Sequence, residues 1–210
     1  MAVEVQYRGD NSDTGPSDGV WFDVDPLASP KKQVEIFEDF VGISGLDLVA
    51  TTTVLSIVGG GVDLVAADDA VDSKFAFLLA DGKDLTFEAR VLPDDAATFR
   101  CGFEDADASD RITFEVAANS AVLHHDNGSS DDTIATKAIT AASWVKLGFR
   151  VRGSGDNTEF TGYVDGVKVA TTNLGDMAAT SVAATIMKLS VICTGTPDVQ
   201  VDWIKAVQLR

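Results

Sequence analysis

The chain has 210 residues, a hydrophobic fraction of 45% and a formal net charge of −17. This length and apolar content suit one sizeable domain with a buried core, and no apolar run is long enough to cross a bilayer, so we expect no membrane partner. The acidic balance also argues against direct binding to nucleic acid, because proteins that bind phosphate backbones use Lys and Arg.

Residues 1–33 differ in composition from the rest of the chain. They are rich in Gly, Pro, Ser and Asp, and their isolated apolar residues include Trp21, Phe22 and Leu27. This composition is typical of an extended arm. We expect those three side chains to anchor the arm in a groove of a neighbouring protein. The first residues show neither a basic nor an apolar segment of a secretory signal, so we expect synthesis in the host cytoplasm.

From Val34 to Arg210, short runs rich in Val, Ile, Thr and Phe alternate in polarity between turn signals, which predicts β-strands. The predicted strands lie near residues 34–40, 46–58, 73–79, 84–92, 98–104, 110–117, 120–126, 132–139, 144–152, 159–165, 167–172, 183–193 and 199–209. Short helical turns are predicted at residues 68–73 and 175–184. This succession predicts an all-β fold, either a two-sheet antiparallel β-sandwich or a barrel, over residues 34–210.

Cys101 and Cys193 each alternate with apolar residues along a predicted strand. Phe99 and Phe103 flank the first cysteine, and Val191 shares a face with the second. We therefore predict that both thiols are small core residues. The pattern leaves a disulfide between them open.

Two acidic segments are candidates for metal binding. Residues 105–110 have the carboxylate density of a calcium loop, but Gly is missing at the sixth position and Glu at the twelfth. His124 and His125 are adjacent on a predicted strand, so their side chains point to opposite faces. Asn127 and Gly128 mark a turn after them. We interpret both segments as turns exposed to solvent.

Residues 144–172 predict two successive β-hairpins. Matching the apolar faces sets Val151 opposite Phe160 and Leu147 opposite Val164, because a slip of one residue would expose a whole apolar row. The other face then carries Trp144, Tyr163 and Arg150. Exposed aromatic and arginine side chains suit a sugar-binding platform and a subunit interface equally well.

These hairpins, together with residues 99–116 and 201–209, resemble the concanavalin A-like lectin/glucanase jelly roll in its laminin-G-like form. The residues that carry the resemblance are Trp144, Val145, Leu147, Tyr163, Asp165, Gly166, Asp202 and Trp203. The resemblance implies a jelly-roll β-sandwich with an extended N-terminal arm. It also implies a calcium ion near a loop, for which Asp105 and Asp107 are the candidate ligands; no other cofactor is expected.

Catalysis is not expected. Glucanases of this fold place Glu-x-Asp-x-Glu along one strand, which brings two carboxylates together on one face. The chain has no such spacing, and no Ser, Cys or Thr stands in a nucleophile-elbow context.

A narrower resemblance is to jelly-roll domains of tailed-bacteriophage virion proteins. Those domains open with an Asp-Phe pair, as at residues 39–40, and continue through a Gly-Phe-x-Asp strand, as at residues 102–105. The resemblance implies a non-enzymatic capsid decoration (cement) protein on the outer capsid surface. Its partners would be the major capsid protein or other virion proteins, and it would form a homo-oligomer on the particle. A fibre or tail component is the less favoured virion role. The alternative is a lectin-like carbohydrate-binding module that uses Trp144 and Tyr163, in a phage fibre or tail or for cell-surface glycans.

Overall fold

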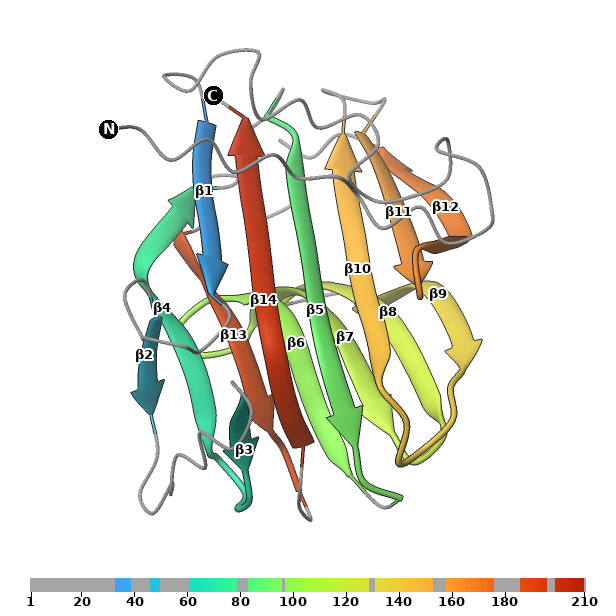
Figure 1. Ribbon diagram of the computed structural model, residues 1–210. Coiled ribbons are helices and arrows are strands. Elements are labelled where there is room, and N and C mark those ends of the chain that lie inside the picture. Colours follow the sequence, from blue (N-terminus) through green and yellow to red (C-terminus); the bar gives the residue numbers. More distant parts are fainter. Residues whose placement is uncertain are drawn as a thin grey trace, which may run out of the picture.

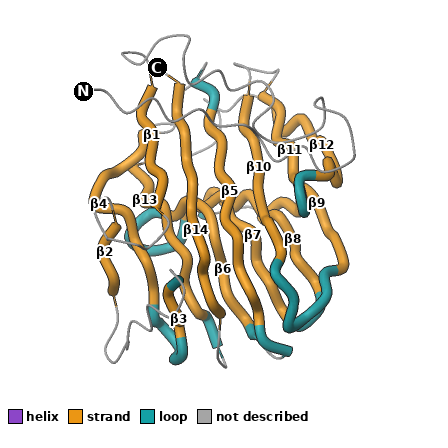
Figure 2. Tube along the Cα trace, in the orientation of Figure 1, coloured by secondary structure: helices purple, strands orange, loops and turns teal. Residues whose placement is uncertain are grey.

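The computed structural model describes residues 33–38, 46–49, 61–78, 83–95, 97–128, 131–152, 158–175, 186–195 and 199–209. Within these ranges the chain forms strands joined by turns, with no helix (Figure 2). The described part accordingly has no helix that could span a membrane. The predicted arm lies outside the described residues up to residue 32, so its division from the rest stays a prediction.

One antiparallel sheet, here called the β10 sheet, has the strand order β1-β14-β5-β10-β11-β12, and β3 also pairs with β14 (Figure 1). Its strands are β1 (Gln33–Glu38), β3 (Val62–Leu64), β5 (Leu85–Pro93), β10 (Val145–Arg152), β11 (Thr158–Val164), β12 (Val167–Gly175) and β14 (Val199–Leu209).

The second antiparallel sheet, here called the β13 sheet, has the order β2-β4-β13-β6-β7-β8-β9 and lies behind the first in Figure 1. Its strands are β2 (Leu46–Val49), β4 (Ala70–Leu78), β6 (Thr98–Glu104), β7 (Asp110–Ala117), β8 (Ser120–Asn127), β9 (Asp131–Ala138) and β13 (Ile186–Cys193). The predicted all-β, two-sheet sandwich is therefore confirmed.

The core lies between the two sheets. Alternate residues of β10 point inward, as the period-two pattern requires, and these inward side chains are at most 4% exposed. Phe103 of β6 lies at the centre: its ring centroid is 4.9 Å from that of Phe77 and 6.1 Å from those of Phe87 and Phe149. Full burial of such a side chain stabilises the fold by roughly 1.5–3 kcal/mol. Contacts among these four phenylalanine rings therefore help to hold the two sheets together.

The hairpin between β10 and β11 has the predicted register, with Val151 opposite Phe160 and Leu147 opposite Val164. The next turn, from β11 to β12, is closed by Asp165 and Gly166, whose φ angles are 53° and 76°. Two positive φ angles are what a tight hairpin turn requires. The predicted strand positions in this region are confirmed.

The prediction of a helical turn at residues 68–73 is wrong. The Asp69 carboxylate accepts hydrogen bonds from the backbone N–H groups of Val65 and Ala66, at 3.2 and 3.0 Å, and this closes a turn. The chain then enters β4 at Ala70. The short strand β3, before the turn, is absent from the predicted strands. The other predicted helical turn, 175–184, lies outside the described residues after residue 175.

Both cysteines are buried core residues, as predicted. Cys101 on β6 and Cys193 on β13 are free thiols. Burial raises the pKa of the Cys101 thiol far above its usual range, because the thiolate would lose its hydration.

Candidate functional site

The outer face of the β10 sheet carries the aromatic residues predicted from the sequence. Trp144 directly precedes β10 and its side chain is 40% exposed. The guanidinium carbon of Arg90 lies 4.5 Å from the centroid of the Trp144 ring, which is a cation–π contact. Arg90 is held in turn by an ion pair with Asp202. The indole therefore has a fixed neighbour on one side and remains accessible.

A β-bulge positions Asp202. On β14, Val201 pairs with Val91 of β5 and Trp203 pairs with Arg90, so Asp202 has no partner of its own in the register. An inserted residue of this kind turns its side chain away from the regular alternation. The bulge therefore directs the Asp202 carboxylate toward Arg90, on the next strand.

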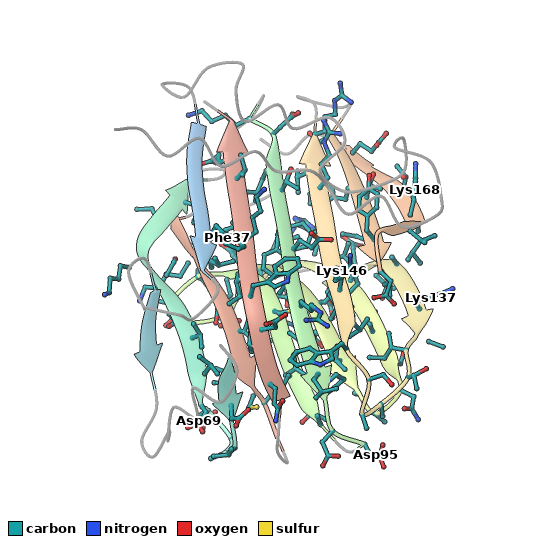
Figure 3. All side chains as sticks on the ribbon, in the orientation of Figure 1. Phe37, Asp69, Asp95, Lys137, Lys146 and Lys168 are labelled. Carbon is teal, nitrogen blue, oxygen red and sulfur yellow. The ribbon has the colours of Figure 1, made fainter. Side chains whose placement is uncertain are left out.

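Tyr163 lies further along the same face, opposite Gly148 of β10. Gly148 has no side chain and so leaves a gap in the row of outward side chains. A Cβ atom there would lie 3.0 Å from the Phe87 carbonyl oxygen, so there is little room for a larger residue. Trp144 precedes Gly148 by four residues, so the two aromatic positions are about 13 Å apart along the strand. Lys146, labelled on β10 in Figure 3, stands between residues 144 and 148 along the strand. We name Trp144, Arg90, Lys146 and Tyr163 the aromatic platform.

Arg150 shares this outer face, as predicted, but it is only 9% exposed. Its Nη2 atom lies 3.5 Å from a carboxylate oxygen of Asp84. The guanidinium beside Trp144 is that of Arg90. This contact was not predicted, because no local sequence pattern shows that β5 pairs with β10. The structure thus brings Trp144 together with Arg90 and leaves Arg150 with Asp84.

The outer face of the β13 sheet carries a network of ion pairs. On β6, Arg100 and Glu104 approach to 3.2 Å. Arg111 of β7 lies 3.3 Å from Glu115 and 3.0 Å from Asp126. These carboxylates are therefore neutralised by arginines on the same or the next strand.

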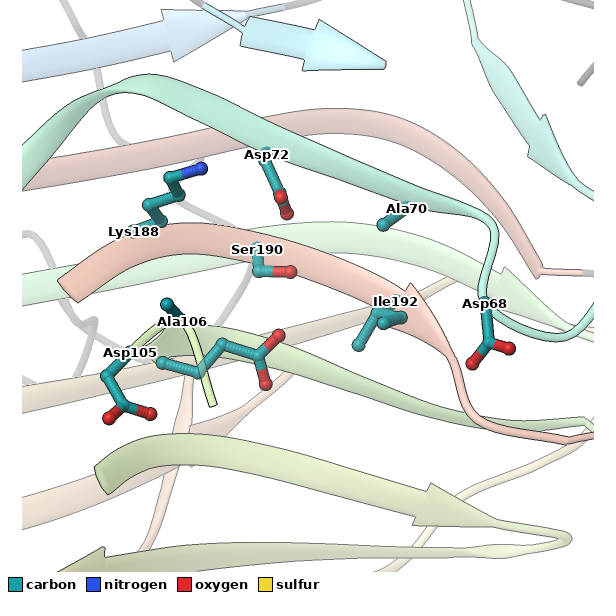
Figure 4. Close-up of a pocket in the computed structure, with 9 residues that line it drawn as sticks. Asp68, Ala70, Asp72, Asp105, Ala106, Lys188, Ser190 and Ile192 are labelled. Atoms are coloured by element: carbon teal, nitrogen blue, oxygen red, sulfur yellow. The ribbon is translucent and has the colours of Figure 1, made fainter. Parts of the chain in front are cut away.

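A pocket of about 240 Å³ opens at one side of this network (Figure 4). It is lined by Asp68, Ala70, Asp72, Glu104, Asp105, Ala106, Lys188, Ser190 and Ile192. Burial raises the pKa of Glu104, and the guanidinium of Arg100 only partly opposes this shift. Ser190 is 2% exposed, and its hydroxyl, beside the Glu104 carboxylate, also favours the charged form of that group.

The candidate calcium ligands lie in the loop between β6 and β7. The Asp105 carboxylate already accepts hydrogen bonds from the backbone N–H and the hydroxyl of Ser109, at 2.9 and 3.0 Å, and from the N–H of Asp110. Asp107 is exposed. Nowhere in the described ranges do three His, Cys, Asp or Glu side chains converge as metal ligands would. The Asp105 carboxylate therefore holds its own loop, and calcium binding by Asp105 and Asp107 stays a prediction.

The two adjacent histidines point to opposite faces of β8, as predicted. His124 faces outward, with its Nδ1 atom 2.8 Å from the Asp131 carboxylate. His125 faces the core and is 1% exposed. Burial lowers the pKa of His125, against the opposing effect of Asp132 and other nearby carboxylates. One metal ion cannot be held by both rings.

The predicted arm anchors Trp21, Phe22 and Leu27 lie outside the described residues. Their contacts, the virion partners and the position on a capsid therefore stay predictions.

No protein-family profile matches the chain, and no curated protein matches its sequence. Solved structures are similar to it in fold. An endo-1,3-β-glucanase from Streptomyces sioyaensis has a TM-score of 0.56 at 14% identity, over 87% of this chain and 98% of its own. The carbohydrate recognition domain of Emp47p has a TM-score of 0.61 at 9% identity, over 85% and 98%.

A Bacillus licheniformis β-glucanase has a TM-score of 0.53 at 11% identity, over 82% of this chain and 97% of its own. The chain therefore has the fold of the concanavalin A-like lectin/glucanase jelly rolls. Since the same fold hosts both enzymes and binding domains, these likenesses concern architecture alone.

Proposed function

We propose that this protein is a non-catalytic carbohydrate-binding module and that the aromatic platform on the β10 sheet is its sugar site. The observation that carries the proposal is the exposed Trp144 indole, oriented by Arg90 and Asp202. Sugar rings present flat C–H faces that stack on aromatic rings, while their hydroxyl groups need charged or polar partners beside the ring. Arg90 and Lys146 supply hydrogen-bond donors next to Trp144, and Arg90 offers up to five.

The fold supports the same proposal. One solved structure of similar architecture is a carbohydrate recognition domain by name. In this chain the sheet's outer face is accessible at Trp144, and the rigid pairing of β5 with β10 fixes the spacing of Arg90 and Lys146, which are directly opposite one another. Preorganised side chains lose little conformational freedom on binding.

A hydrolytic function is less well supported. The outward residues of β6 are Thr98, Arg100, Gly102 and Glu104, so this strand offers one carboxylate, and an arginine is paired with it. On β7 the outward Glu115 is likewise paired with Arg111. Glycosidases of the usual kind need two carboxylates at a defined separation across the sugar.

The test is binding to an array of glycans, followed by affinity measurements on the best ligand. Trp144→Ala and Tyr163→Ala are expected to weaken binding by roughly 30-fold each, because a central aromatic contact is commonly worth about 2 kcal/mol. Phe37→Ala is the matched control, since Phe37 is also an exposed aromatic residue, 42% accessible, on β1 at the far edge of the same sheet. A glycan that binds equally well to all three variants, or the absence of any glycan ligand, would refute the proposal.

A further inference from the structure

We propose that the ligand of the aromatic platform is an acidic glycan. Arg90 and Lys146 bind the anionic group of one of its sugars, a carboxylate or a sulfate, while a sugar ring stacks on Trp144. This assignment rests on the proposed sugar binding and adds the chemical class of the sugar that the same surface selects.

The register of β5 and β10 places two positive side chains directly opposite one another. Several other cations of the described strands face a carboxylate on the neighbouring strand: the pairs are Arg100 with Glu115, Arg111 with Asp126, Arg152 with Glu159 and Lys205 with Glu88. Arg90 instead faces Lys146. Like charges in this position destabilise a sheet, and the chain has only 16 Lys and Arg against 33 Asp and Glu. An anionic ligand that uses both charges explains why they stand together.

Both cations keep hydrogen-bond donors for a ligand. The Arg90 side chain is 37% exposed and pairs with Asp202 through Nη1 alone, so its Nε and Nη2 groups are available. The Lys146 ammonium forms no ion pair within the described part of the chain, and the Asp165 carboxylate accepts the backbone N–H of Lys146, at 2.9 Å. A guanidinium has five donors and an ammonium three. Charge-assisted hydrogen bonds from such groups to an anion are stronger than those between neutral groups.

The neighbouring carboxylates leave this part of the face suited to an anion. Asp202 balances Arg90, and Glu88 lies opposite Lys205 on β14. Asp165 is exposed to solvent at the turn between β11 and β12. The net charge of −17 has little influence at this point, because charges more than about 8 Å apart are largely screened at physiological ionic strength. The charge of Lys146 is therefore the one that an anionic group of the sugar meets.

A second indole lies on the other side of Arg90. Trp203 of β14 is paired with Arg90 in the register and is partly exposed, and residues directly opposite one another share a face of the sheet. Strands β10 and β14 are two strand spacings apart, about 10 Å. Arg90 on β5 thus stands between Trp144 and Trp203. A glycan of several sugars can stack on both indoles while its anionic group meets the guanidinium.

The experiment begins with an array that holds uronic-acid, sialylated and sulfated glycans together with the neutral form of each, in which the carboxyl group is reduced to an alcohol or the sulfate is removed. The best acidic ligand and its neutral form are then compared by isothermal titration calorimetry at physiological ionic strength. The acidic form is expected to bind at least about tenfold more tightly, because the neutral form lacks the charge-assisted hydrogen bonds. The carboxylate and sulfate members of the array show which anionic group the platform takes.

Three variants assign the selection to its residues. Lys146→Met is expected to weaken the acidic form about tenfold or more and the neutral form about threefold or less, because only the first loses an ionic contact. Trp144→Ala is expected to weaken both forms by a similar factor, since stacking does not depend on the anionic group. Lys137→Met is the matched control, and it is expected to change neither, because Lys137 is an exposed lysine on β9 at the edge of the other sheet.

Sugar binding and the selection of acidic sugars can fail separately. If neutral glycans bind as tightly as acidic ones and depend on Trp144, sugar binding stands and the selection is refuted. The selection is also refuted if Lys146→Met weakens the acidic and neutral forms by the same factor, or if it behaves like Lys137→Met. The absence of any glycan ligand refutes both.

Discussion

Gly102 offers a sharp test of how closely β6 and β7 approach on the β13 sheet. Its φ angle is +149°, and a Cβ atom at this position would lie 2.2 Å from the Ile112 carbonyl oxygen and 2.9 Å from the Thr113 Cα. Gly166 also has a positive φ, +76°, but a Cβ atom there would meet nothing within 4 Å. Both glycines therefore have a positive φ angle, and they differ in the space around them.

The expected loss of stability follows from this difference. An unfavourable φ for a residue with a Cβ costs about 1–3 kcal/mol, and this is the whole cost at Gly166. At Gly102 the clash is with backbone atoms, so it can be relieved only by displacing a strand, which adds about 1–3 kcal/mol. We expect Gly102→Ala to lower the free energy of unfolding by about 2–6 kcal/mol and Gly166→Ala by about 1–3 kcal/mol.

Urea denaturation of both variants, followed by tryptophan fluorescence, measures the two losses. Equal losses, or a larger loss for Gly166→Ala, would contradict the close approach of the two strands.

Three other predictions concern the core. Phe103→Ala is expected to destabilise the fold by about 3–5 kcal/mol in the same denaturation assay, because it removes the ring at the centre of the aromatic contacts; a loss below about 1 kcal/mol would contradict that packing. Cys101 is expected to react with a thiol reagent only in denaturant, because burial keeps it protonated and inaccessible; rapid labelling of the folded protein would refute this. The folded-state pKa of His125 lies below its unfolded value of about 6.5. As the pH falls, the unfolded chain therefore takes up the proton first. The contribution of the neutral His125 to the free energy of unfolding is full above pH 6.5 and decreases as the pH falls below it. His125→Leu is expected to remove that part of the pH dependence measured between pH 7 and 5, whereas His124→Gln is not.

Local sequence patterns were enough to predict the sandwich and the hairpins. The alternation of Val145, Leu147, Phe149 and Val151 leaves one register in which every apolar side chain is buried, and the Asp165-Gly166 turn fixes it. In such a hairpin the partners are close in the sequence. The alternation of side chains and the turn residues are therefore enough to predict the strand positions and register of this hairpin.

The aromatic platform and the pocket both depend on pairings that no local pattern specifies. Trp144 meets Arg90 only because β10 lies beside β5, and Arg90 meets Asp202 only because of the bulge in β14. Asp72 meets Ser190 because β4 lies beside β13, from which it is far removed in the sequence. The beginning of β4 was missed for a local reason, since Asp68 and Asp69 before it and Asp72 within it are typical of turns.

The ion pairs on the β13 sheet lie flat along its outer face and cover the small residues beneath them. Arg100 and Glu104 are four residues apart on one strand, about 13 Å along it, yet their side chains meet at 3.2 Å. Both must therefore lie along β6 and over Gly102, where a large side chain would block them.

Arg111 and Glu115 do the same over Thr113 on β7. The register aligns Thr113 with Gly102 and Gly102 with Ser190, so a row of small residues crosses three strands beneath charged side chains. This row buries Ser190 and Thr113, and the Ser190 hydroxyl lies beside the Glu104 carboxylate. Filling the row with larger residues is therefore expected to break the ion pairs that lie over it.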